Sequence, residues 1–193
     1  MREPLVPVVD HLPDATLAFE LPTPFPVGPV NCYVLLEEPV TVIDPGMLFG
    51  GTLATLSTEL AAVGLGVGDV DAVVVTHAHP DHYGTAGWLA EQADAPIYAG
   101  RPELPKLLET RDRHLLYELI RSFGIPEEML GVFPVFYGAV KEWLHEIDES
   151  RVVPVDDGDI LWLGGRQLEA MVTPGHAAGH LSLWEPTSSR LLS

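Results

Sequence analysis

The sequence predicts an α/β (α+β) fold. Most of the evidence for this prediction comes from two neighbouring segments. The apolar run "DAVVVT" at 71–76 is typical of a strand that is covered on both faces. Upstream of it, residues 52–63 repeat leucine and valine at the spacing of one helix face, which predicts an amphipathic helix. Alternation of such strands and helices indicates a sheet with helices packed against it.

The other elements of the first hundred residues continue this alternation. Short β-prone runs separated by Pro, Gly and Glu predict strands at 16–21, 31–36 and 40–44. After the valine strand, we expect a helix from about Gly84 to Ala93 and a short strand at 95–99.

Residues 101–148 interrupt this pattern with two apolar stripes at helical spacing, which predict a helical insertion. The stripes consist of Leu115, Leu116, Leu119, Ile120 and Phe123, and of Phe136, Val140, Trp143, Leu144 and Ile147. Four aromatic residues of the insertion either line a substrate pocket or pack its own helices: Phe133, Phe136, Tyr137 and Trp143. Five short strands should follow, at 151–155, 159–163, 166–173, 181–184 and 190–192. The length predicts a single domain, residues 1–193.

Composition limits the possible partners. Asp and Glu number 28 against 10 Lys and Arg, a formal charge of −18, and the basic residues are scattered, so we expect no nucleic-acid binding. No signal-peptide pattern and no run of about 18 apolar residues is present, which favours a cytoplasmic protein that is not bound to a membrane. The single cysteine, Cys32, lies in an apolar run and is expected in the core. The sequence does not decide whether the chain forms a homo-oligomer.

The stretch "THAHPDH" at 76–82 places three histidines and one aspartate within six positions, directly after the valine strand. In an extended segment His77 and His79 point the same way, whereas Pro80 turns the chain before Asp81 and His82. Two adjacent metal sites follow from this arrangement. Imidazole and carboxylate ligands without cysteine suit a catalytic zinc ion first, with iron or manganese as alternatives.

A second cluster, "VTPGHAAGHLSL" at 172–183, places His176 and His180 in a Gly-rich turn after a predicted strand. Such a turn can bring an imidazole back to the first histidine loop. We expect His176 to complete a three-nitrogen site with His77 and His79. His180 is expected to orient a neighbouring ligand rather than to bind the ion.

The residues around both clusters resemble those of the metallo-β-lactamase superfamily. "THAHPDH" resembles the superfamily's His-x-His-x-Asp-His signature, "TPGHAAGH" resembles its next motif, and "NCYVL…VTVIDPG" is similar to its N-terminal stretch. The resemblance covers residues 15–100 and 150–193, and the six-residue signature is highly specific. It is strongest to the small-molecule hydrolase branch, which includes glyoxalase II-like thioesterases and lactonases.

This resemblance implies a four-layer αβ/βα sandwich with a dinuclear site at the edge of two packed sheets. The ligands of the first metal would be His77, His79 and His176. Those of the second would be Asp81 and His82, while Asp44 would support the metal loop without binding an ion.

The family pattern continues beyond Ser193. In the family, a bridging aspartate follows the strand after the second motif, and a last histidine comes some tens of residues later, whereas this chain ends at "SSRLLS". We therefore expect the C-terminal part of the sandwich to be missing, the second metal site to be incomplete in this chain, and one sheet edge to be unpaired.

These features predict a metal-dependent hydrolase that uses a metal-bound hydroxide to cleave an ester, thioester or lactone-like bond of a small acyl substrate, with Asp81 orienting the nucleophile. The first alternative is a mononuclear-iron persulfide dioxygenase, in which histidines hold one iron with open positions. The second is a metal-binding module without catalysis. A nuclease is disfavoured by the negative charge.

Overall fold

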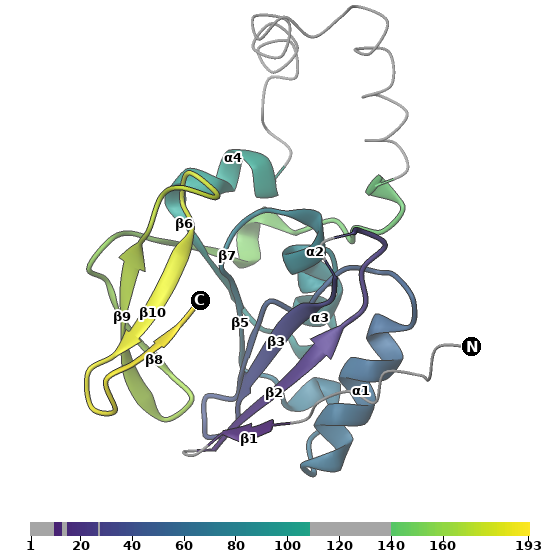
Figure 1. The fold of residues 1–193 in the computed structure, drawn as a ribbon, viewed down its shortest axis with the longest axis horizontal. Coiled ribbons are helices and arrows are strands. Elements are labelled where there is room, and N and C mark those ends of the chain that lie inside the picture. Colours follow the sequence, from purple (N-terminus) through teal and green to yellow (C-terminus); the bar gives the residue numbers. More distant parts are fainter. Residues whose placement is uncertain (1–9, 13–14, 27, 109–139) are drawn as a thin grey trace, which may run out of the picture.

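The computed structural model describes residues 10–12, 15–26, 28–108 and 140–193. Its main element is a seven-stranded mixed sheet with the order β1-β2-β3-β4-β5-β6-β7 (Figure 1). Neighbours from β1 to β4 pair antiparallel, and those from β4 to β7 pair parallel. The strands are β1 (Asp10–Leu12), β2 (Thr16–Leu21), β3 (Val30–Leu35), β4 (Thr41–Ile43), β5 (Ala72–Val75), β6 (Ile97–Gly100) and β7 (Val152–Val155).

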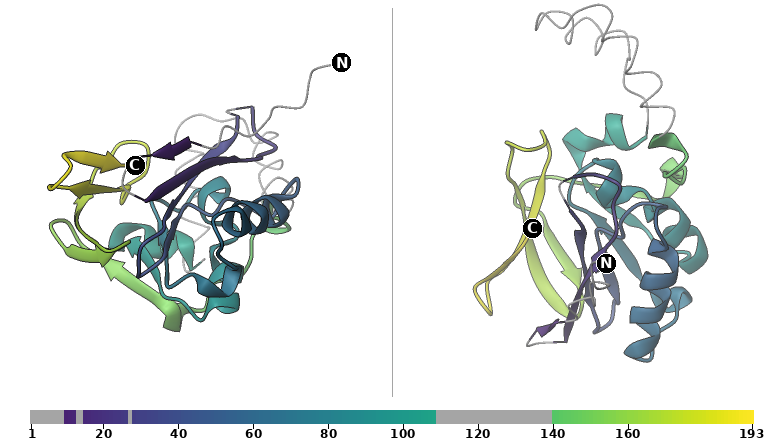
Figure 2. Two further views of the ribbon diagram at one scale, coloured as in Figure 1. Left: turned by 90° about the horizontal axis from the view of Figure 1, so that it is seen from below. Right: turned by 45° about the vertical axis from the view of Figure 1, so that its right-hand side comes forward.

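Helices cover one face of this sheet (Figure 2, right). In α1 (Thr52–Ala62), Leu56 and Leu60 are fully buried, as the leucine spacing predicts. Burying one such side chain stabilises the fold by roughly 1.5–3 kcal/mol. The remaining helices are the α-helices α2 (Pro80–Tyr83), α3 (Ala86–Ala93) and α4 (Leu104–Leu107) and the short 3-10 helices η1 (Val67–Asp69), η2 (Arg101–Glu103) and η3 (Glu149–Arg151).

A four-stranded antiparallel sheet covers the other face of the large sheet, in the order β11-β10-β9-β8 (Figure 1). Its strands are β8 (Ile160–Leu163), β9 (Arg166–Val172), β10 (Leu181–Glu185) and β11 (Arg190–Leu192). Val73 and Val75 of β5 join the core beneath the helices, and Val74 joins the core between the two sheets. The valine strand is therefore buried on both faces, which confirms the α/β prediction.

The outer face of the small sheet carries several exposed apolar side chains beside polar ones such as Gln167 and Glu169. Ile160 is 55% exposed and Trp162 is 64% exposed, and Leu191 lies on the same sheet with half of its surface accessible. Within the described part of the chain no element packs on this face, so three layers are present: helices, large sheet and small sheet. Among the described strands, β11 and β8 are the two edges of this sheet.

Only the two ends of the predicted insertion can be compared with the structure. Residues 109–139 lie outside the described residues, and with them the stripe from Leu115 to Phe123 and three of the four aromatics, Phe133, Phe136 and Tyr137. Trp143 packs edge-on against Phe25 and Phe49, with ring centroids 6.5 and 5.5 Å apart. Its role is therefore packing, but against two loops rather than against the insertion's own helices. No described helix has the length and apolar character needed to span a bilayer.

The returning segment, residues 143–147, packs tightly over α2 and α3. The backbone N–H of His145 donates to the Gly84 carbonyl at 2.7 Å, and the N–H of Leu48 donates to the Trp143 carbonyl at 2.9 Å. At Gly87 of α3, a Cβ atom would collide with the Glu146 carbonyl. This helix position needs glycine because a neighbouring backbone occupies the space of a side chain.

We predict that Gly87→Ala destabilises the protein, although alanine normally stabilises a helix by up to about 1 kcal/mol relative to glycine. The collision with the Glu146 carbonyl should outweigh that gain and lower the free energy of unfolding by about 1–3 kcal/mol, as measured by urea denaturation. Gly68→Ala is the matched control, because nothing lies within 4 Å of its Cβ position. A Gly87→Ala protein as stable as the control would contradict the packing of this segment.

Candidate metal centre

The predicted ligands lie where the parallel strands of the large sheet end. Asp44 directly follows β4, and the histidine loop follows β5. The loop between β9 and β10 of the small sheet reaches the same place, because the Leu181 backbone N–H donates to the Thr76 carbonyl at 2.8 Å. Ligands that are distant in the sequence therefore meet at one end of both sheets, which is a usual location for sites in open α/β sheets.

Three of the predicted ligands form one cluster. The candidate ligand nitrogens of His77, His79 and His176 all lie within 4.8 Å of one another, and Nε2 of His77 is 3.0 Å from Nδ1 of His79. Two nitrogens that bind one tetrahedral zinc ion at about 2.0–2.1 Å are about 3.3 Å apart. The spacing and the all-imidazole donor set fit a single zinc, iron or manganese ion.

Hydrogen bonds fix which nitrogen of His77 carries the proton. Oδ1 of Asp44 accepts from the Thr76 backbone N–H at 2.8 Å, and Oδ2 accepts from the Thr76 hydroxyl at 2.6 Å. Because that hydroxyl has only one proton, it accepts at its oxygen from Nδ1–H of His77, 3.0 Å away. Nε2 of His77 therefore presents its lone pair to the cluster.

The environment keeps two candidate ligands in the neutral form that can bind a metal. Burial and the neighbouring histidines lower the pKa of His77 from 6.5 to about 2, and the side chain is only 2% exposed. Burial, together with the charge of Lys106, lowers the pKa of His79 to about 4. Both imidazoles are therefore free of competing protons at neutral pH, as a metal ligand must be.

Asp81 and His82 lie beside the cluster as a separate pair. Their Oδ2 and Nε2 atoms are 4.0 Å apart, while Nδ1 of His82 donates to Oδ2 of Asp44 at 2.7 Å. Burial lowers the pKa of His82, but the hydrogen bond and the charge of Asp44 outweigh it, so the net shift is upward. Among the described residues, this pair is not part of the group whose ligand atoms converge, which is His77, His79 and His176.

His180 also approaches the cluster, with its ring centroid 5.1 Å from that of His77. Its Nδ1 lies 3.1 Å from the Thr173 hydroxyl, at the start of the same loop. Burial lowers the pKa of His180. The contact with Thr173 joins the two ends of the loop that carries His176, and the supporting role of His180 stays a prediction.

Sequence reasoning missed two residues of this region, Thr76 and Glu103. Thr76 connects Asp44 to His77 through its hydroxyl. Glu103 is 4% exposed and accepts hydrogen bonds from the backbone of both histidine loops. The sequence offered one indication for each residue. Thr76 directly precedes the histidine signature. Glu103 follows the strand next to β5 in a parallel sheet, where functional side chains gather.

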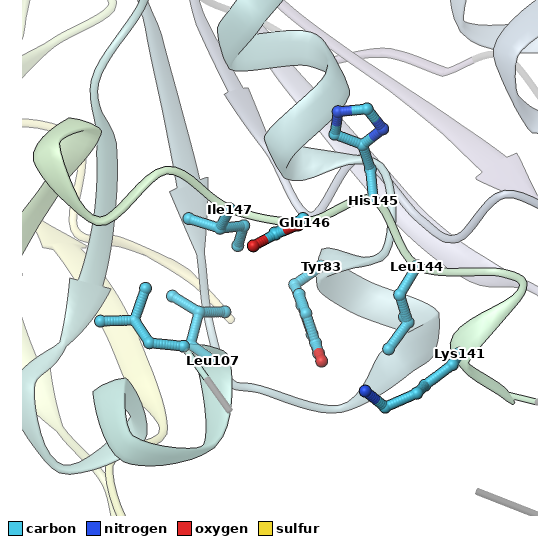
Figure 3. A pocket seen from close by; sticks show the side chains of 8 residues that line it. Tyr83, Leu107, Lys141, Leu144, His145, Glu146 and Ile147 are labelled. Carbon is cyan, nitrogen blue, oxygen red and sulfur yellow. The ribbon is translucent and has the colours of Figure 1, made fainter. Parts of the chain in front are cut away.

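A cavity of about 290 Å³ lies between α2, α4 and the returning segment (Figure 3). Tyr83, which directly follows His82, points its hydroxyl toward the same end of the cavity as the Lys141 amine. The lining residues are Tyr83, Leu107, Leu108, Lys141, Leu144, His145, Glu146 and Ile147. The volume is close to the lower end of the range for small-molecule pockets.

Two packed sheets with histidine loops at one end match a known protein family. The family model of the metallo-beta-lactamase superfamily matches residues 25–193, a stretch that contains every predicted ligand. The chain therefore belongs to the metallo-beta-lactamase superfamily, and the resemblance inferred from the motifs is confirmed.

Relatives of known sequence extend beyond the region that this chain covers. The probable metallo-hydrolase YqjP of Bacillus subtilis is 26% identical over 184 residues, and the match covers 91% of this chain and 55% of the relative. An uncharacterized protein of Aquifex aeolicus is 30% identical over 165 residues, with 83% of this chain and 63% of the relative covered. The chain thus spans less than two thirds of the length of either protein.

Solved structures show the same fold. The metallo-beta-lactamase family protein TTHA1429 of Thermus thermophilus superposes with a TM-score of 0.79 at 27% identity, over 92% of this chain and 58% of its own. BJP-1, a subclass B3 metallo-beta-lactamase of Bradyrhizobium japonicum, gives a TM-score of 0.60 at 22% identity, over 89% of this chain and 54% of its own. The second similarity concerns the fold alone.

We predict that His176→Ala weakens zinc binding by more than about a hundredfold, because it removes one of three converging nitrogens. His180→Ala should lower the zinc affinity about ten- to a hundredfold, which is the usual effect of removing a group that orients a ligand. Zinc competition with a chromophoric chelator measures both. His145→Ala is the control, since its imidazole contacts Glu91 outside the cluster. Equal losses in the His176 and His180 variants would contradict the assignment of His176 as the ligand.

The stability of the metal-free protein should fall as the pH decreases from about 6.5 toward 4. Because the pKa of His77 is lowered in the folded protein, the imidazole of His77 becomes protonated in the unfolded chain at a higher pH than in the folded one. Each pH unit below 6.5 therefore lowers the free energy of unfolding by up to about 1.4 kcal/mol for this one proton. His82 acts in the opposite sense, since its raised pKa gives stability below 6.5 that is lost as the pH rises through the folded value.

Urea unfolding in the presence of a chelator at pH 5 and pH 7 measures this dependence. His77→Asn should make it shallower, because the variant no longer excludes that proton. His145→Asn should leave the slope as it is in the wild type. An unchanged slope in His77→Asn would show that His77 titrates normally in the folded chain.

Proposed function

We propose that this chain carries the metal-binding part of a hydrolase that cleaves an ester, thioester or lactone-like bond of a small molecule. The observation that carries the proposal is the cluster of His77, His79 and His176, whose nitrogens converge at the end of the two sheets. Membership of the metallo-beta-lactamase superfamily supports metal-dependent hydrolysis in general. The acyl substrate is our inference from the sequence and from the cavity beside α2, whose lining includes none of the candidate metal ligands.

The donor set favours zinc at the three-histidine cluster, with iron or manganese as alternatives, because all three accept imidazole nitrogen. When bound, such an ion lowers the pKa of a bound water toward about 7 and polarises a carbonyl oxygen. The chain's own groups keep the site ready for it: Thr76 orients His77, and burial holds His77 and His79 neutral.

Asp81 and His82 would hold a second ion next to the first. Asp44 orients His82 by accepting from its Nδ1–H, which leaves Nε2 directed toward Asp81. The partly buried Asp81 carboxylate is our candidate for orienting the nucleophile, since a carboxylate accepts a hydrogen bond from a water or hydroxide beside it. Further ligands of this second ion would come from outside the described residues.

The charge of the chain and the cavity support the proposed substrate class. A net charge of −18 repels polyanions, so a nucleic-acid substrate is disfavoured. The cavity beside α2 offers the side chains of Leu107, Leu144 and Ile147 to an apolar group, and the Tyr83 hydroxyl to a polar one. A small acyl compound with an apolar part fits this lining.

The zinc-loaded chain should hydrolyse chromogenic ester, thioester or lactone substrates, and the double variant His77→Ala with His79→Ala should lose at least about a hundredfold in kcat/KM. Loss of the metal removes several kcal/mol of transition-state stabilisation, and each 1.36 kcal/mol is tenfold in rate. Ser57→Ala, on the exposed side of α1, is the control that retains activity.

The same preparations separate the alternatives. Oxygen consumption with glutathione persulfide by the iron-loaded chain, without hydrolysis, would replace the proposal by a dioxygenase. Metal binding with neither reaction would leave a metal-binding module. Hydrolysis that is the same in the double variant as in the wild type would refute the metal-dependent mechanism.

A further inference from the structure

Glu103 connects the two loops that carry the clustered histidines. One carboxylate oxygen, Oε2, accepts from the backbone N–H of Ala78 at 3.0 Å, and the other, Oε1, accepts from the backbone N–H of Gly179 at 2.8 Å. Ala78 lies between His77 and His79, and Gly179 directly precedes His180. A single side chain thus contacts the middle of the first histidine loop and the end of the second.

The contact is buried and charge-assisted. Glu103 is 4% exposed, Ala78 is fully buried and Gly179 is also buried. Hydrogen bonds from an N–H to a carboxylate are shorter and about twice as strong as those between neutral groups. With both oxygens used, the carboxylate holds two donors at a fixed separation, which a neutral amide of the same size cannot do because it has one oxygen.

Glycine makes this approach possible. A Cβ atom on Gly179 would lie 2.9 Å from Cδ of Pro102 and 3.1 Å from the backbone nitrogen of Glu103. A Cβ atom on Gly100 would collide with the Gly179 carbonyl. The segment from β6 through η2 therefore packs directly on the backbone of the second histidine loop, and this brings the Glu103 carboxylate within reach of both loops.

We propose that Glu103 is a positioning residue that sets the distance between the His77–His79 pair and His176, and thereby the metal affinity of the cluster. The loops belong to different sheets, so the packing of the sheets alone leaves their relative position adjustable. The other described backbone link between them is the bond from Leu181 to Thr76. Glu103 adds one side-chain bridge, with a hydrogen bond from Ala78 at one end and a hydrogen bond from Gly179 at the other. The inference rests on the three-histidine metal site but not on the reaction.

Glu103→Gln tests the inference while preserving size. It should weaken zinc binding at least about tenfold, because one amide N–H then faces the side-chain NH₂ instead of an acceptor. Zinc affinity is measured by competition with a chromophoric chelator. The absorption spectrum of the cobalt-substituted protein reports the ligand geometry, and hydrogen exchange of Ala78 and Gly179 in the metal-free protein reports the loop contacts.

Glu185→Gln is the matched control for a loss of stability alone. Glu185 is a buried carboxylate of the small sheet, 3.6 Å from Arg166 and bonded to Ser188, away from the histidine loops. Its variant should unfold more easily and yet bind zinc and give a cobalt spectrum as the wild type does. A role of Glu103 in stability alone would make the two variants behave alike.

Gly179→Ala provides a second test in case Glu103→Gln does not fold. It forces the second histidine loop away from η2 and leaves the carboxylate intact, so it should also weaken zinc binding. Wild-type zinc affinity and cobalt spectrum in the variants that fold would overturn the role of Glu103 while the metal site stands. Failure of the wild-type chain to bind zinc would overturn the metal site and this inference with it.

Discussion

The site depends on one buried carboxylate, that of Asp44. This carboxylate accepts hydrogen bonds from the Thr76 backbone N–H, the Thr76 hydroxyl and Nδ1–H of His82. The backbone N–H of Asp44 donates to the Val74 carbonyl. These bonds tie the end of β4 to the start of the histidine loop and to α2. They also set the tautomer of His77 through the Thr76 hydroxyl. A buried carboxylate with several charge-assisted bonds is costly to rearrange, and these bonds therefore favour the observed geometry of the loop.

The architecture explains why such a network can serve a metal. Parallel strands β4, β5 and β6 end at the same edge of the large sheet, and the small sheet brings the loop between β9 and β10 to that edge. Side chains from both sheets then converge at one place, where burial lowers the pKa of His77 and His79. Neutral, converging imidazoles at the end of a rigid sheet are suited to metal binding, because little has to reorganise when the ion arrives.

The two sheets differ in how much of their surface is exposed to solvent. The large sheet is covered on both faces, whereas the small sheet exposes Ile160 and Trp162 on its outer face. The chain spans 55% of the Bacillus relative and 58% of the Thermus structure, so these proteins contain further polypeptide.

The sequence by itself determined the fold class, most strand positions and the chemical type of the site. The valine run identified β5, and the close spacing of His77, His79, Asp81 and His82 indicated metal ligands, since such patterns are local. The motifs also pointed to His176 as the partner of His77 and His79, and the structure brings these three side chains together. Only the tertiary structure revealed the link from Asp44 through Thr76 to His77, and the contact of Glu103 with Gly179 across 76 positions. No local pattern reports such a contact, because it arises only when two sheets pack and their loops reach the same edge.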